Sequence, residues 1–355
     1  MGVAIFHLQV ASHFYPMLFF RHSYLLVDFF FVLSGFVISH SYSGRLSNIG
    51  EVKSFAIKRF ARVWPLHLVR LSIFVIFEIA VFAAYQWAPW LFPRPPFSED
   101  RTVPAIFVNL ALLNGVGIYE GSTWNGPSWS ISAEFFTYLI FATVFLFPKK
   151  ARDGLIVALL VIAFSAIAFF APKYLATSSD FGLYRCVLGF FTGHLAWRIR
   201  DGLPRLTGNG LECAVVAGVV VFIILADVGP LQLLSPLIFG LVILVFANES
   251  GIISRMLLTR PFQKLGEWSY SIYMVHFFLA FLLNNIFRAA GKMFEIRTTF
   301  PGTDLALVGS SWAMDAVTIT YALGVVAIAS ISYRYIERPG MRYFSRPVVN
   351  SAAAV

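Results

Sequence analysis

Ten ionisable side chains, Glu78 among them, lie inside apolar stretches of this sequence, and three of them are the strongest candidates for chemistry. His7 lies in AIFHLQV, Glu134 in PSWSISAEFFTY and His276 in SYSIYMVH. Placing an ionisable group in an apolar environment costs at least a few kcal/mol, which makes each one a candidate for function. An imidazole can take and return a proton near neutral pH, so His7 is a candidate base, although a lone histidine in a helix is more often a packing residue. Glu134 could orient a histidine or bind a polar substrate, but a buried structural carboxyl explains it equally well.

A basic cluster lies in the segment FAIKRFARVWPLHLVR, at residues 55–70. Lys58, Arg59 and Arg62 are spaced so that a helix would carry them on one face. Guanidinium groups bind phosphate oxygens in a bidentate manner, so the cluster could hold a ligand with several phosphates, such as coenzyme A. Anchoring to lipid headgroups is the simpler alternative, and composition alone favours it.

The elements that position these side chains are predicted to be transmembrane helices. The chain has 355 residues, of which 58% are hydrophobic and 13% charged, with a mean hydropathy of +0.75. A soluble domain has about a quarter charged residues, and apolar stretches of about twenty residues are typical of membrane spans. We therefore predict an all-α, polytopic bundle of about ten spans. The predicted spans are Val3–Leu18, Tyr24–Tyr42, Val63–Gln86, Pro127–Phe147, Gly154–Ala171, Gly182–Ile199, Leu211–Asp227, Leu231–Asn248, Glu267–Phe287 and Trp312–Tyr333.

The distribution of basic residues predicts how these spans cross the membrane. An eleventh apolar stretch, Val103–Tyr119, is shorter and contains Gly115 and Gly117. If it does not cross, most Lys and Arg residues fall in cytoplasmic segments, as is typical of membrane proteins. We therefore expect Val103–Tyr119 to be a re-entrant or interfacial helix. We also expect the protein to lie in the inner membrane of the cell, with both termini in the cytoplasm.

The excess of Lys and Arg in cytoplasmic segments accounts for the net charge of +9, so we expect no nucleic-acid partner. Residues 1–345 are predicted to form a single membrane domain, followed by a short cytoplasmic tail at 346–355. Membrane lipid is the expected surrounding, and we expect no metal.

Six motifs along the chain give a resemblance to a known family. His7 ends the first, and Arg59 and Arg62 form an Arg-x-x-Arg pair in the third. Glu134 supplies the acid of a Trp-Ser-x-x-x-Glu motif in the fourth. The motifs are GVAIFH, VDFFFVLSGFVIS, FAIKRFARVWPLHL, WSISAEFFTY, LGEWSYSIYMVH and SYRYIERP. In this order they resemble the acyltransferase family 3 of integral-membrane O-acyltransferases, from Val3 to about Arg342.

The resemblance implies that an acyl group, commonly acetyl, moves from acyl-CoA to a hydroxyl of a carbohydrate or glycosylated acceptor. It implies that His7 is catalytic and that Arg59 and Arg62 bind the donor. We expect Lys58 to assist donor binding and Glu134 to act with His7. The residues predicted to contact substrate are Asp28, Trp129, Ser130 and His276.

Two other classes of protein fit the same residues less well. A proton-coupled small-molecule transporter would also place His and Glu residues within spans, but internal symmetry between two halves is not visible here. A membrane scaffold would have no need of His7, Glu134 and the arginine pair together.

The first motif departs from the family pattern. In the family, an arginine lies eleven residues before the histidine, whereas Met1 lies only six before His7. We therefore expect the gene to continue in frame upstream of Met1, with an arginine codon at that distance. The SGNH-type esterase domain found at the C-terminus of some family members does not follow Arg346 in this sequence.

Overall fold

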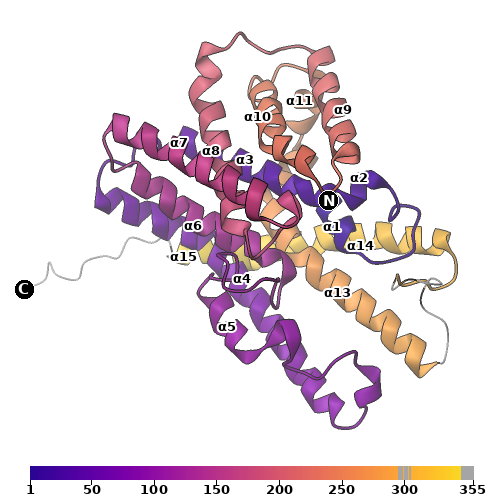
Figure 1. The fold of residues 1–355 in the computed structure, drawn as a ribbon. Helices are drawn as coiled ribbons and strands as arrows, with labels where there is room; N and C mark the ends of the chain where they lie inside the picture. The colour runs from indigo at the N-terminus through magenta and orange to yellow at the C-terminus, as the bar shows by residue number, and fades with distance from the viewer. Residues whose placement is uncertain (295–298, 300–302, 304, 345–355) are drawn as a thin grey trace, which may run out of the picture.

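A computed structural model describes residues 1–294, 299, 303 and 305–344 of the chain, and in this part the secondary structure is helical (Figure 1). The extended backbone within these ranges is limited to isolated bridges from Val10 and Thr299 to Ala306. The all-α prediction is therefore confirmed. The predicted tail at 346–355 lies outside the described residues.

Helices α3 (Leu26–Tyr42) and α8 (Gly182–Ile199) form the most closely packed pair. A Cβ at Gly35 would lie 1.9 Å from the Phe190 carbonyl oxygen, and one at Gly193 would lie 1.9 Å from that of Val32. Glycines of this kind let two helix backbones approach each other directly. Helices α3 and α8 are therefore in direct backbone contact at Gly35 and Gly193.

Helix α4 (Ile49–Tyr85) is the longest element and begins well before the predicted span. The Asn48 side chain caps it by accepting a hydrogen bond of 3.0 Å from the Glu51 amide. Helix α13 (Ser269–Met293) runs parallel to it, because Tyr270 contacts Val63 near one end while Phe281 packs on Phe77 farther along both. The two helices therefore pack side by side over several turns.

Every predicted span after the first coincides with a helix. The helices not yet described are α2 (Leu18–Arg21), α5 (Val103–Leu110), α6 (Trp129–Val144), α7 (Lys149–Ser165), α9 (Asn209–Leu225), α10 (Ser235–Phe246), α11 (Ile252–Leu257), α12 (Arg260–Glu267), α14 (Ser311–Ser332) and α15 (Arg338–Phe344). Helix α7 continues into a π-helical turn, Ala166–Phe170, and α14 continues into another, Tyr333–Glu337.

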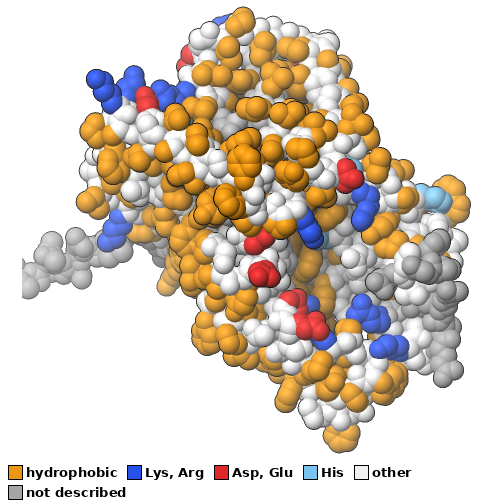
Figure 2. All heavy atoms as spheres, in the orientation of Figure 1, with side chains coloured by type: hydrophobic (Ala, Val, Ile, Leu, Met, Phe, Trp, Pro, Cys, Tyr) orange, Lys and Arg blue, Asp and Glu red, His pale blue; other side chains and the backbone are white. Residues whose placement is uncertain are grey.

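Five helices in the described part are long and apolar enough to cross a membrane. They lie within Ser23–Tyr42, Ile49–Tyr85, Lys149–Phe170, Ser269–Met293 and Ser311–Phe344. Asn209–Leu225 and Pro230–Phe246 are apolar but shorter. Hydrophobic side chains cover much of the face shown in Figure 2, which indicates a membrane protein. Helix α5 has only 8 residues, or about 12 Å of helix, which is too short to span.

The predicted helix Val3–Leu18 is wrong in extent. Helix α1 covers only Gly2–His7, and the chain then becomes extended. The Ala11 amide donates to the Ala306 carbonyl at 2.8 Å, and the Ala306 amide donates to the Gln9 carbonyl at 3.0 Å. This pairing with a distant segment satisfies the backbone groups that a longer helix would have satisfied internally.

Candidate active site

A cavity of about 380 Å³ lies between α3, α4, α6 and α13, and we call it the arginine cavity. Arg59 and Arg62 line it from α4, together with Glu134 and Ser130 from α6. Four of the residues singled out in the sequence are thus brought together from two separate motifs. The remaining wall is largely apolar, with Phe30, Phe31 and Val37 of α3 among its residues.

The two arginines have different environments within this cavity. Arg62 forms an ion pair with the buried carboxylate of Glu337. Arg59 forms no ion pair with any residue the structure describes, and its guanidinium lies over the rings of Tyr42 and Phe55, at 5.4 and 5.7 Å from their centroids. Arg59 is therefore the cation whose charge is available to an anionic ligand.

Glu134 lies one turn from Ser130 on α6, so both face the arginine cavity. Its Oε1 accepts a hydrogen bond of 2.6 Å from the Tyr138 hydroxyl, which is itself 2.9 Å from the Ser34 hydroxyl. Glu134 and His7 form no hydrogen bond with each other. The ionisable group beside His7 is His276.

His7 and His276 form a pair at the inner side of this site. The Nδ1 of His7 lies 3.2 Å from Nε2 of His276 and 2.9 Å from the Val3 carbonyl oxygen. A carbonyl oxygen can only accept, so the hydrogen-bond network assigns the proton of His7 to Nδ1. The lone pair on Nε2 of His276 then accepts from the Nδ1–H of His7. The Nε2 of His7 carries no proton, so its own lone pair is free.

Tyr273 connects the histidine pair to the arginine cavity. Its ring lies 5.5 Å from the His276 ring between centroids, and it also lines the arginine cavity. Its hydroxyl accepts a hydrogen bond of 2.8 Å from Ser130. A path of neighbouring side chains thus leads from the arginine cavity through Tyr273 to His276 and His7.

The structure does not bring every predicted residue to this site. Lys58 is exposed and does not line the arginine cavity. Asp28 is completely buried in an ion pair with Arg185 of α8, and both carboxylate oxygens are engaged, at 2.9 and 2.7 Å. Trp129 is buried beneath the same arginine, whose guanidinium is 5.3 Å from its ring. Asp28 and Trp129 thus form part of the contact between α3, α6 and α8.

Sequence reasoning missed Tyr138, Tyr273 and Glu337 as members of the site. Glu337 lies in the closing motif SYRYIERP, and Tyr273 lies in the motif that ends in His276. Their presence in these motifs was the available signal. Their partners are far away in sequence, so the contacts depend on the fold.

Comparison with known proteins places the chain in a family. A family model described as an acyltransferase domain matches residues 1–334. Acyltransferase MdmB of Streptomyces mycarofaciens is 26% identical over 354 residues, which cover 91% of this chain and 82% of that protein. Protein 2 in picA locus of Rhizobium radiobacter is 30% identical over 155 residues, or 41% of this chain and 75% of that protein. No solved structure matches the chain. The chain therefore belongs to acyltransferase family 3, and it is an acyl-transferring enzyme rather than a transporter.

Proposed function

We propose that this protein is a membrane-embedded O-acyltransferase that moves an acetyl group from acetyl-CoA to a hydroxyl of a carbohydrate or glycosylated acceptor. The observation that carries the proposal is the convergence of Arg59, Arg62 and Glu134 on one cavity, whose wall residue Tyr273 packs against a histidine pair. Family membership supports acyl transfer, and the named relative MdmB is itself called an acyltransferase.

The arginine cavity suits the phosphate-bearing end of the donor. Arg59 has no carboxylate partner among the described residues, so a phosphate would meet an uncompensated guanidinium. Arg62 would either leave Glu337 to bind a phosphate or bind Glu337 and the phosphate at the same time. Lys58, exposed one residue before Arg59, would add charge at the entrance. The pantetheine arm of the donor would then extend toward Tyr273.

His7 is the proposed base. A hydroxyl is a poor nucleophile until its proton is removed, and Nε2 of His7 has the free lone pair to accept it. The oxygen then bonds to the acyl carbon, the bond from that carbon to sulfur breaks, and the proton passes from His7 to the thiolate to give free CoA. The same imidazole could instead carry the acyl group transiently, with the ester formed in a second step.

His276 and Glu134 have supporting roles in this proposal. When His7 is protonated, its Nδ1–H donates to the Val3 carbonyl and to the His276 lone pair, which stabilises the imidazolium. Glu134 and Ser130 face the arginine cavity and would position the substrates there. Asp28 and Trp129 would act on substrate binding only through the helices that they hold together.

We also propose ten membrane crossings, with both termini in the cytoplasm of the cell and the protein in the inner membrane. Five helices are long and apolar enough to cross, and α5 is too short to add another crossing. In this arrangement the first crossing is made by the short α1 together with the segment that follows it up to Leu18. The arginine cavity then opens toward the cytoplasm, where acyl-CoA is available.

The function is tested with purified protein in lipid nanodiscs, [1-¹⁴C]acetyl-CoA and an extract of a host strain that lacks the gene. The wild type should transfer label to a glycan or glycoside that mass spectrometry identifies. His7→Ala should lower this transfer at least a hundredfold, because a positioned base contributes about 10²–10⁴ in rate. The matched control is His40→Ala, an exposed histidine outside the arginine cavity. Equal activity of His7→Ala and wild type would refute the assignment of the base.

A further inference from the structure

A second cavity, of about 530 Å³, lies at the other end of α4 and α13, and we call it the outer cavity. Its walls come from Phe77–Val81 of α4, the segment 91–101 and Phe281–Ala289 of α13. Arg62 and Glu78 are sixteen residues apart on α4, which corresponds to about 24 Å of helix. The two cavities therefore lie at separate places along α4.

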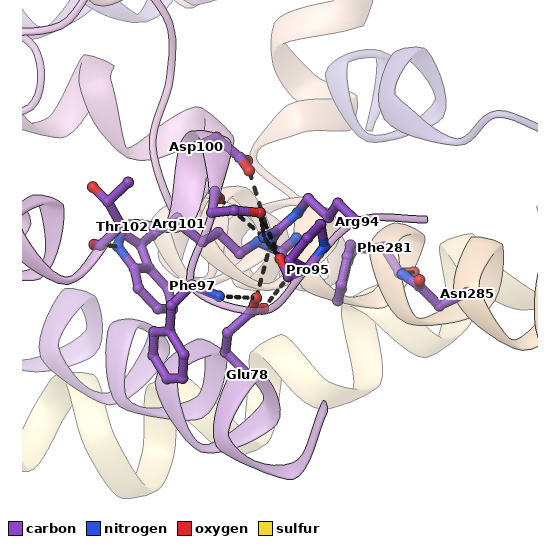
Figure 3. Close-up of polar contacts among 11 residues, drawn as sticks. Glu78, Arg94, Pro95, Phe97, Asp100, Arg101, Thr102, Phe281 and Asn285 are labelled. Atoms are coloured by element: carbon purple, nitrogen blue, oxygen red, sulfur yellow. Dashed lines mark hydrogen bonds and ion pairs between the residues drawn. The ribbon is translucent and has the colours of Figure 1, made fainter. Parts of the chain in front are cut away.

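One wall of the outer cavity is held by the buried carboxylate of Glu78 (Figure 3). It binds Arg101 at 3.0 Å and Arg94 at 3.1 Å, and it accepts a hydrogen bond of 3.0 Å from the Phe97 amide. Phe97 and Glu99 have φ angles of 56° and 53°, in the left-handed region that non-glycine residues rarely adopt. Glu78 thus holds a strained loop in place against α4.

The opposite wall, on α13, offers polar atoms that have no partner among the residues that the structure describes. Asn285 uses its amide N–H to donate to the Phe281 carbonyl at 2.8 Å, and its Oδ1 has no hydrogen bond within the described ranges. Arg288, one turn farther, is exposed and forms no ion pair with the residues described. Across the cavity, the Nε of Arg101 is buried and unpaired there too. All three groups belong to residues that line the outer cavity, so a ligand in this cavity would meet them.

The chemistry of the lining indicates a neutral, hydroxyl-rich ligand. Three carboxylates (Glu78, Glu99, Asp100) and three guanidinium groups (Arg94, Arg101, Arg288) line the cavity, so its formal charge is zero. A polyanion such as CoA would find no excess of positive charge here. In Figure 2, acidic and basic side chains lie together beside the hollow between the lower end of α4 and α13. A lining with both donors and acceptors matches hydroxyl groups, which both donate and accept.

Aromatic side chains form the floor of the cavity and lead to the histidine pair. Phe281 packs against Phe77 at 5.2 Å between ring centroids, and Arg101 lies 4.2 Å above its ring. Phe74 contacts both Phe281 and Phe277, and Phe277 packs edge-on against His7 at 5.4 Å. Phe281 is five residues beyond His276, or about 7.5 Å along α13. The outer cavity is thus connected to His7 through Phe281, Phe74 and Phe277, which pack against one another in turn.

We infer that the outer cavity binds the acyl acceptor, and that this acceptor is an uncharged, polyhydroxylated group such as a glycoside. Asn285 and Arg288 bind its hydroxyls, and Phe281 packs against its apolar face. The reacting hydroxyl extends past Phe277 to Nε2 of His7. This inference rests on the proposed function, because it requires a hydroxyl acceptor and a separate donor site.

The test uses the same nanodisc assay and varies one substrate at a time. The probes are [1-¹⁴C]acetyl-CoA and graded amounts of the extract from the gene-deleted host, which contains the native acceptor. Asn285→Ala and Arg288→Gln should each raise the amount of extract needed for half-maximal transfer by about fivefold, as expected for one lost hydrogen bond. The KM for acetyl-CoA should stay within twofold of wild type.

The control lies on the same helix. Asn284→Ala removes the same carboxamide at a position that does not line the outer cavity, and it should leave the extract titration unchanged. Unchanged titrations for Asn285→Ala and Arg288→Gln would overturn the inference and leave Glu78 and its arginines as a structural cluster. A higher KM for acetyl-CoA in these variants would also overturn it, because the cavity would then serve the donor. A wild type that transfers no label would instead refute the proposed function and this inference with it.

Discussion

The proton on Nδ1 of His7 determines what this residue can do. With Nδ1 committed to the Val3 carbonyl and facing the lone pair of His276, the second nitrogen is left free. A lone histidine would have to be held by packing alone, and its ring could present either nitrogen. In the proposed mechanism, the second imidazole fixes which nitrogen of His7 faces the substrate.

Replacing His276 tests this role. His276→Ala should lower kcat about ten- to a hundredfold, since a hydrogen bond to a charged group is worth about 1.5–3 kcal/mol. The KM for acetyl-CoA should not change. His276→Gln should retain more activity than His276→Ala, because its amide oxygen can accept from Nδ1–H of His7. If the two variants have equal kcat values, His276 serves only to pack against His7.

The two arginines of the arginine cavity should respond differently to lysine. Arg59→Lys keeps the charge but loses the bidentate fork, so the KM for acetyl-CoA should rise about tenfold. Arg62→Lys should have a smaller effect, because part of the role of Arg62 is its ion pair with Glu337, which an ammonium can also form. Steady-state kinetics with varied acetyl-CoA measures both. Wild-type KM values in both variants would return this segment to lipid anchoring.

Some of the site could be predicted from the sequence, and some could not. The Arg-x-x-Arg pair and Glu134 were predicted as site residues on motifs, and the structure brings them to one cavity. The contact between His7 and His276 joins residues far apart in the chain and follows only from packing α1 against α13. Glu78 was visible as an ionisable residue in an apolar stretch, but its partners Arg94 and Arg101 lie in a loop that carries no periodic pattern.

At the scale of helices, the packing of α3 on α8 leaves no room for a side chain at Gly193. Gly193→Ala should destabilise the protein by roughly 3 kcal/mol, because the new methyl group would meet the Val32 carbonyl and force the helices apart. The measurement is thermal unfolding in detergent. Gly218→Ala on α9 is the matched control, since nothing lies within 4 Å of its added Cβ, and it should stay within about 1 kcal/mol of wild type. Equal melting temperatures would show that the two helices can separate without loss.

Apolar runs predicted where most helices lie, but not how the first one ends. Val3–Leu18 is apolar enough to be read as one helix, yet residues 9–11 pair with Ala306. Hydropathy reports how apolar a segment is and not which backbone partner it finds. The π-helical turns at the ends of α7 and α14 could not be predicted from hydropathy either, because they depend on local hydrogen bonding.

At the scale of the whole molecule, the proposed topology can be measured. In a Cys213→Ser background, cysteines at Lys149 and Arg205 should be protected in intact cells from a membrane-impermeant maleimide. Cysteines at Trp87 and Lys173 should be labelled. Only opening the cells should make the first pair reactive. Labelling of Lys149→Cys from outside would mean that the chain crosses once more before α7 and that the ten-crossing proposal is wrong.

The arginine cavity and the outer cavity are both built on α4 and α13, yet their linings share no residue. A substitution that reshapes one therefore leaves the side chains of the other in place. Over evolutionary time, such a scaffold can acquire a new acceptor by drift in the loop at residues 91–101 and the distal half of α13, while the machinery for the thioester is inherited unchanged. The same separation offers a practical route to redirecting the enzyme: grafting that loop and half-helix between relatives should transfer acceptor preference without transferring donor preference.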